Sequence, residues 1–139
     1  MTENAPEPTP LRILGIGSEP ATLQRLHHAL GSLGHRFESF LDAKRLFFTL
    51  KADEIMGCGF DALITSPDVP GLGLDAMVVG VRELYKITPI ILCTEAELGK
   101  ADKRFFRQKG VDLYLPKPFK LPDLEAVLKD VSGIKARNI

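Results

Sequence analysis

The sequence has few of the residues and patterns on which several protein classes depend. Its two cysteines, Cys58 and Cys93, form no CxxC or histidine-partnered pattern, so we expect reduced thiols in the interior of a cytoplasmic protein and no disulfide framework. No apolar run approaches the roughly 18 residues of a membrane-spanning helix. Residues 1–10 are acidic and proline-rich; they lack the basic and apolar regions of a signal peptide and are predicted to be a flexible tail.

No excess charge points to a class of partner either. The 18 basic and 18 acidic residues cancel, and the basic residues form no run. We therefore expect neither nucleic-acid nor membrane binding. Apolar residues make up 45% of the 139-residue chain, which is typical of one globular domain with a sizeable core.

Apolar periodicity predicts five strand–helix units between residues 11 and 132, followed by a C-terminal tail over 133–139. The predicted strands are 11–16, 35–41, 60–65, 89–93 and 111–115. Helices are expected from Pro20 to about Gly34, after a cap at Asp42, and over 76–85, 98–109 and 120–131. Strict alternation favours a doubly wound α/β fold with a parallel sheet. Its two solutions at this length are a Rossmann-like half and a flavodoxin-like (βα)5 sandwich of strand order 2-1-3-4-5, and we predict the second.

The residues that follow the predicted strands should meet in one crevice, because the carboxyl ends of parallel strands share an edge of the sheet. They are Gly17, Ser18, Ser66, Thr94 and Lys117. Ser66 is the first residue past the third strand, whose pairing is ended by prolines at 67 and 70. Lys117 lies between two prolines, and a cis bond to Pro118 would aim its side chain back at the crevice.

Several of these residues carry a resemblance to a known family. Thr94, Tyr114, Lys117-Pro118-Phe119, Glu19-Pro20 and the proline four residues after Ser66 resemble the receiver domain of two-component response regulators, over about residues 11–131. In that family an aspartate after the third strand accepts a phosphoryl group from a histidine kinase, beside Mg²⁺ held by an acidic pair. The resemblance implies that the threonine and lysine contact the phosphoryl oxygens and that the tyrosine rotamer follows the threonine.

The sequence departs from the family at the positions that perform this chemistry. Ser66 occupies the phosphoacceptor position, and Gly17 and Ser18 occupy the positions of the acidic pair. Three further positions also differ: Gly73 stands where the family has an acid, Leu74 where it has a glycine, and Glu95 where it has a small residue. Mg²⁺ requires carboxylate ligands, and phosphoryl transfer depends on the metal. We therefore predict a pseudo-receiver with no metal, no cofactor and no enzymatic activity. With no carboxylate evident beside it, Lys117 is expected to bond Ser66 or Ser18.

A pseudo-receiver is expected to act through its surface, as a phosphorylation-independent protein-interaction module in signal transduction. The resemblance implies a partner face formed by the fourth helix, fifth strand and fifth helix, and here it includes Lys103, Arg104, Phe105, Phe106 and Arg107. The partner is expected to be a signalling or kinase-related protein, or a second copy. Adjacent phenylalanines on a helix cannot both point inward, so one of them should be exposed.

Other hypotheses remain open at this point. Ser66 could act with Asp68 or Glu19 as a base, which would make the protein a working receiver or a small hydrolase. A third possibility is a flavin-type binder on the same strand order. No output domain follows the last predicted helix, so we expect either a stand-alone regulator or a fragment of a larger protein.

Overall fold

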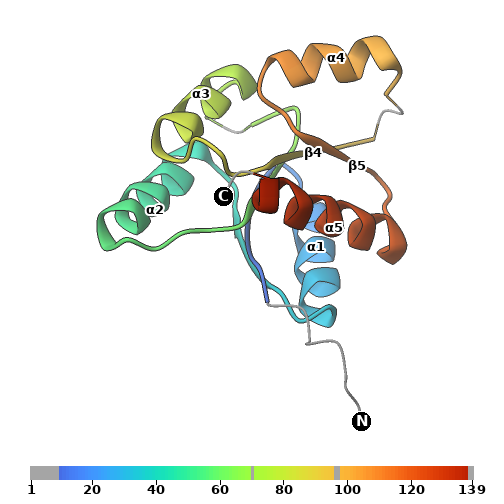
Figure 1. The fold of residues 1–139 in the computed structure, drawn as a ribbon, viewed down its shortest axis with the longest axis horizontal. Coiled ribbons are helices and arrows are strands. Elements are labelled where there is room, and N and C mark those ends of the chain that lie inside the picture. Colours follow the sequence, from blue (N-terminus) through green and yellow to red (C-terminus); the bar gives the residue numbers. More distant parts are fainter. Residues whose placement is uncertain (1–9, 70, 96–97, 138–139) are drawn as a thin grey trace.

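The computed structural model describes residues 10–69, 71–95 and 98–137, in which strands and helices alternate (Figure 1). The strands are β1 (Arg12–Ile16), β2 (Arg36–Phe40), β3 (Ala62–Thr65), β4 (Ile90–Thr94) and β5 (Leu113–Pro116). The helices are α1 (Pro20–Ser32), α2 (Ala43–Met56), α3 (Leu74–Leu84), α4 (Lys100–Gln108) and α5 (Leu121–Arg137). All five predicted strand–helix units are therefore present.

The five strands form one parallel sheet in the order β2-β1-β3-β4-β5. This confirms the flavodoxin-like arrangement and excludes the Rossmann-like half. Thr65, the last residue of β3, is in register with Ile16, the last residue of β1, and with Leu92 of β4, which continues to Thr94. The loops that follow these strands consequently meet at one edge of the sheet.

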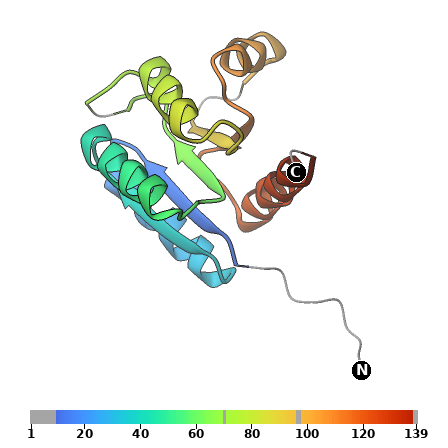
Figure 2. The same ribbon diagram turned by 60° about the vertical axis from the view of Figure 1, so that its left-hand side comes forward.

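Helices cover both faces of the sheet (Figure 2). Successive strand residues point to opposite faces, and the core is accordingly divided in two. In β1, Leu14 and Ile16 pack with the α2 and α3 side, whereas Ile13 packs with the α1 and α5 side. Gly15 allows the Phe37 ring to pack over β1 on the α1 and α5 side, because a Cβ at Gly15 would come within 2.4 Å of that ring.

The ends of some elements differ from the predicted ones. Asp42 caps α2 as expected, accepting a hydrogen bond from the Arg45 N–H at 3.0 Å. The cap position of α1 is Glu19, and Pro20 is the first helical residue, as expected. Helix α5 was expected to end at Val131 and continues to Arg137, so a tail over 133–139 is wrong for residues 133–137. The tail predicted at 1–10 lies almost wholly outside the described residues.

None of the described helices is long and apolar enough to cross a bilayer.

Candidate functional site: a crevice at the carboxyl edge of the sheet

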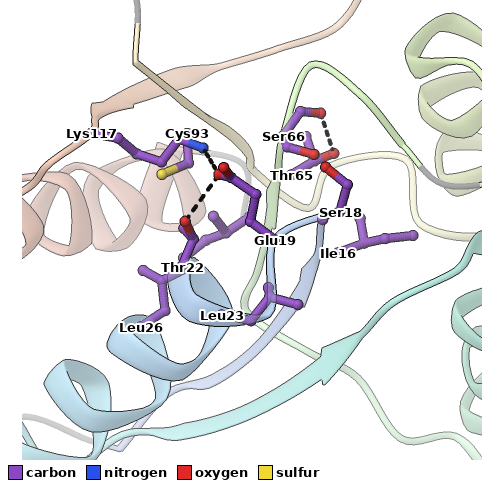
Figure 3. Close-up of a pocket in the computed structure, with 12 residues that line it drawn as sticks. Ile16, Ser18, Glu19, Thr22, Leu23, Leu26, Thr65, Ser66, Cys93 and Lys117 are labelled. Carbon is purple, nitrogen blue, oxygen red and sulfur yellow. Dashed lines mark hydrogen bonds and ion pairs between the residues drawn. The ribbon is translucent and has the colours of Figure 1, made fainter.

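A small pocket lies where β1, β3 and β4 end against the start of α1 (Figure 3). Its volume is about 20 Å³, which is room for one water molecule. Four of the predicted site residues line it, namely Gly17, Ser18, Ser66 and Lys117. The loops that were predicted to meet therefore do meet. The pocket that they enclose is nearly filled by the side chains that line it.

An ion pair between Lys117 and Glu19 closes one side of this pocket. The Lys117 Nζ lies 2.6 Å from the Glu19 Oε1, and the Thr22 hydroxyl donates to the same oxygen at 3.2 Å. The Lys117–Pro118 bond is cis, as the two flanking prolines suggested. The lysine was expected to bond Ser66 or Ser18, and that expectation is wrong because Glu19 supplies the carboxylate.

The electrostatics of the two groups agree with a charged pair. The hydrogen bond and the charge of Lys117 lower the pKa of Glu19, with a further contribution from Thr22. Burial alone would lower the pKa of Lys117, but the hydrogen bond and charge of Glu19 outweigh it, and the net shift is upward. The Lys117 side chain is 14% exposed and that of Glu19 53%, so water screens the pair from one side only.

The Ser66 hydroxyl makes its hydrogen bond within its own loop. It donates to the main-chain carbonyl of Asp68 at 2.5 Å, and the Ser66 N–H donates to the Ile16 carbonyl at 3.2 Å. The hydroxyl thus bonds neither the Asp68 nor the Glu19 carboxylate, the two bases considered for it. A serine hydroxyl without an adjacent base is a weak nucleophile.

The acidic-pair positions contribute no carboxylate to the pocket, because they are Gly17 and Ser18. Within residues 10–69, 71–95 and 98–137, no group of three or more histidine, cysteine, aspartate or glutamate side chains is placed to hold a metal ion. Among the described residues that line the pocket, only Glu19 carries a carboxylate, and this carboxylate is paired with Lys117.

Thr22 and Cys93 are among the pocket residues that sequence reasoning missed. Thr22 follows Glu19 by three residues at the start of a helix, a spacing at which side chains meet. Cys93 is buried, and burial raises the pKa of its thiol to about 11 despite the nearby Lys117, so the thiol stays protonated at neutral pH. Cys58, also expected in the interior, is exposed.

Thr94 and Tyr114 do not line the pocket. The Thr94 carbonyl accepts a hydrogen bond from the Lys117 N–H at 2.9 Å, which fixes the start of the Lys117 loop. The Tyr114 hydroxyl donates to the Lys103 carbonyl of α4 at 2.6 Å. Burial raises the pKa of Tyr114, and Arg107 opposes the shift. The tyrosine is therefore fastened to α4 rather than to the crevice.

The two phenylalanines of α4 have different surroundings, as expected for adjacent residues. Phe106 packs against the core, whereas Phe105 is 53% exposed. The rings meet edge to face, with centroids 5.3 Å apart. The Lys109 Nζ lies 4.6 Å from the centre of the Phe105 ring and also pairs with Asp75 at 2.7 Å, so a cation covers part of the exposed ring.

No family model matches the sequence. The chain is 28% identical over 122 residues to the transcriptional regulatory protein TcrA of Mycobacterium tuberculosis, which covers 88% of this chain and 46% of that protein. The chain thus spans about half the length of the curated relatives that it matches.

Solved structures of receiver domains resemble the chain over most of its length. The chemotaxis response regulator CheY4 of Vibrio cholerae is 25% identical with a TM-score of 0.72, covering 88% of this chain and 99% of that one. The receiver domain of the sensor histidine kinase PA1611 of Pseudomonas aeruginosa, which holds a magnesium ion in its cleft, is 24% identical with a TM-score of 0.74, covering 90% and 99%. The chain therefore has the receiver-domain fold of two-component response regulators.

Proposed function

We propose that this protein is a pseudo-receiver, a phosphorylation-independent protein-interaction module on the receiver fold. The observation that carries the proposal is the 2.6 Å ion pair between Lys117 and Glu19. In the receiver family the equivalent lysine is the phosphoryl-binding cation. In this chain the Glu19 carboxylate pairs with that lysine in place of a phosphoryl group. The positive charge of Lys117 is therefore balanced without phosphorylation.

The residues across from this pair support the same conclusion. Gly17, Ser18 and Ser66 stand where the family has three aspartates. Mg²⁺ binds oxygen ligands in near-octahedral geometry, usually with one or two carboxylates among them. Without a metal, the charge that develops during phosphoryl transfer is not neutralised. We infer that phosphorylation is not the signal that this domain reads.

The alternatives of a working receiver and a small hydrolase would use Ser66 as the nucleophile. Both need a base within hydrogen-bond reach of the Ser66 hydroxyl. That hydroxyl donates to the Asp68 main-chain carbonyl, and the Glu19 carboxylate is held by Lys117. These contacts favour a structural role for Ser66 and a protein that is not an enzyme.

The partner surface that we propose for this function lies on and around α4. Helix α4 carries the exposed Phe105 together with the exposed cationic residues Lys103, Arg104 and Arg107. Aromatic and arginine side chains are enriched at protein interfaces. The proposed occupant is a signalling or kinase-related protein or a second copy, rather than nucleic acid or a membrane.

Acetyl phosphate with Mg²⁺, followed by intact-mass measurement, tests the proposal. The expected result is no added phosphate. A phosphorylated species that disappears in Ser66→Ala would overturn it. The matched positive control is the triple variant Gly17→Asp, Ser18→Asp, Ser66→Asp, which restores the family's carboxylates. A Cβ at Gly17 would lie 3.5 Å from the Ser66 Oγ, an ordinary contact, so the variant should fold. It is expected to bind Mg²⁺ and accept phosphate, and a folded variant that does neither would contradict the importance given to these positions.

A further inference from the structure

The outer side of α2 exposes more apolar surface than a helix of a soluble domain needs. Phe48 is 77% exposed and Ile55 is 84% exposed, and Met56 is also exposed. Phe48, Ala52 and Ile55 follow each other at four- and three-residue spacing, so they form one stripe along the helix. Helix α2 lies at the outside of the molecule in both views, and no other described element covers this side (Figures 1 and 2).

The stripe is not required to hold α2 in place. Ala43, Leu46 and Leu50 on the opposite side are buried in the core. Phe47 packs against Gly80 of α3, where a Cβ would come within 2.7 Å of the ring. Since the helix is anchored by these residues, the exposed side chains contribute little to its stability. Monomeric proteins rarely leave a contiguous apolar patch uncovered without a function.

Positive charge borders the stripe. Lys44 and Lys51 lie along one side of it and Arg45 along the other, by their helical spacing. Within the described part of the chain, none of the three side chains has an ion pair. We call the surface formed by Lys44, Arg45, Phe48, Lys51, Ala52, Ile55 and Met56 the α2 outer face.

The carboxylates near the α2 outer face are already in use. Asp42 caps the helix, and Glu38 and Asp53 both pair with Arg12, at 3.2 and 2.8 Å. Glu54 lies on the side toward Tyr85, whose pKa it helps to raise after burial and Asp53. The unpaired charge on this face is therefore positive.

A groove continues the face toward the sheet. It has a volume of about 960 Å³ and runs between the end of β2 and the first turns of α2, with Leu41 and Phe48 on its walls. Strand β2 is at the edge of the sheet, so no further strand closes this side. A groove of mixed lining, with apolar walls at Leu41 and Phe48, next to an apolar stripe bordered by cations fits an elongated amphipathic ligand.

We propose that the α2 outer face and its groove bind an amphipathic helix with acidic flanks, presented by a partner protein. Apolar side chains of such a helix would enter the groove and cover the stripe. Its carboxylates would pair with Lys44, Arg45 and Lys51. This surface is distinct from the α4 surface proposed above and does not depend on the state of the crevice.

Two other occupants fit the observations less well. A second copy would bring its own three cations against these three, and like charges across an interface oppose association. A flat anionic bilayer would not fill a concave groove.

The probe for this proposal is a synthetic amphipathic peptide with a leucine stripe, glutamates on both sides and one tryptophan. The protein has no tryptophan, so the fluorescence of the peptide reports binding alone. We expect saturable binding that weakens with salt and backbone amide NMR shifts concentrated in residues 43–56. Phe48→Glu with Ile55→Glu should weaken binding at least about tenfold. The matched control is Val79→Glu, at an exposed apolar residue of α3 outside both proposed surfaces, and it should leave binding unchanged.

Each other outcome overturns the proposal. Equal binding of a lysine-flanked peptide would show that charge does not select the ligand. Absence of binding, or loss of binding in the Val79→Glu control, would place recognition elsewhere. Binding to anionic vesicles but not to the acidic peptide would assign the face to a membrane, and a dimer abolished by Phe48→Glu would assign it to a second copy. None of these results bears on the acetyl phosphate test, so the two proposals fail separately.

Discussion

Helices α2 and α4 both present phenylalanines to solvent, but they are attached to the molecule in different ways. Helix α2 buries Leu46 and Leu50 completely, whereas α4 has no residue of its own that is fully buried. Each helix receives one tyrosine hydroxyl at a main-chain carbonyl. Tyr85 donates to Leu50 of α2 at 3.1 Å, and Tyr114 donates to Lys103 of α4 at 2.6 Å.

The difference indicates what the exposed aromatic residues are for. Phe106 is needed to attach α4, and the exposed part of Phe105 is partly covered by Lys109. Phe48 has no such role, because α2 is held from its other side. An exposed apolar residue on a firmly anchored helix is therefore better evidence for a binding surface than one on a loosely anchored helix.

The largest expected effect is on the anchor of α2. Leu50→Ala removes a fully buried side chain and should lower the free energy of unfolding by about 2–5 kcal/mol. Urea denaturation measures it as a lower midpoint at unchanged slope. The neighbouring exposed variant Lys51→Ala should stay within about 0.5 kcal/mol of the parent. A similar loss in both variants would contradict the anchoring described for α2.

A smaller effect is expected for the anchor of α4. Phe106→Ala should cost roughly 1–2 kcal/mol, less than for a buried phenylalanine, because Phe106 is only partly buried. Hydrogen exchange should accelerate in residues 100–108 before the rest of the chain. Phe105→Ala is the control and should leave exchange in α4 nearly unchanged. If the two variants behaved alike, the division of roles between the two rings would be wrong.

Sequence periodicity identified the elements and the sheet order, but it could not assign these roles. Leu46, Phe47 and Leu50 recur at helical spacing and therefore indicate the inner side of α2. The additional apolar residues Phe48, Ile55 and Met56 give this helix apolar side chains on more than one side, and such a pattern is usually typical of a buried helix. Which of Phe105 and Phe106 points inward depends on the rotation of α4, and neighbouring residues in a sequence carry no information about that rotation.

The crevice was predicted in the same incomplete way. The strand ends placed Gly17, Ser18, Ser66 and Lys117 together, because register in a parallel sheet follows from the apolar pattern. The partner of Lys117 was missed because Glu19 is the cap of a helix and was not counted among the residues at the strand ends. The hydrogen bond of Ser66 to the Asp68 carbonyl depends on loop geometry, for which the sequence has no periodic signal.

The smallest effect is expected from the two tyrosines. Tyr85→Phe and Tyr114→Phe should each cost about 1 kcal/mol, the net value of one hydrogen bond. Burial is the main cause of the raised pKa of both phenols, so the folded state favours the protonated form. Their stabilisation is complete below the ordinary tyrosine pKa of about 10 and is lost as the pH rises through the folded pKa.

Phenolate absorbance measures this titration without interference, because the chain has two tyrosines and no tryptophan. In Tyr85→Phe the signal comes from Tyr114 alone, and in Tyr114→Phe from Tyr85 alone. Each remaining phenol should titrate above the pKa that it shows in urea. A phenol that titrates at the same pH in both states would remove that tyrosine from the comparison of the two helices.

The Glu19–Lys117 pair also bears on the order in which the molecule is completed during synthesis. Glu19 is made early and stands at the start of the first helix, but its partner follows 98 residues later. Until Lys117 has emerged from the ribosome, the Glu19 carboxylate and the loops after β1 and β3 face water without their cation. Contacts of such long sequence separation form late in folding. The crevice therefore cannot close with its ion pair until the last strand–helix unit is being made.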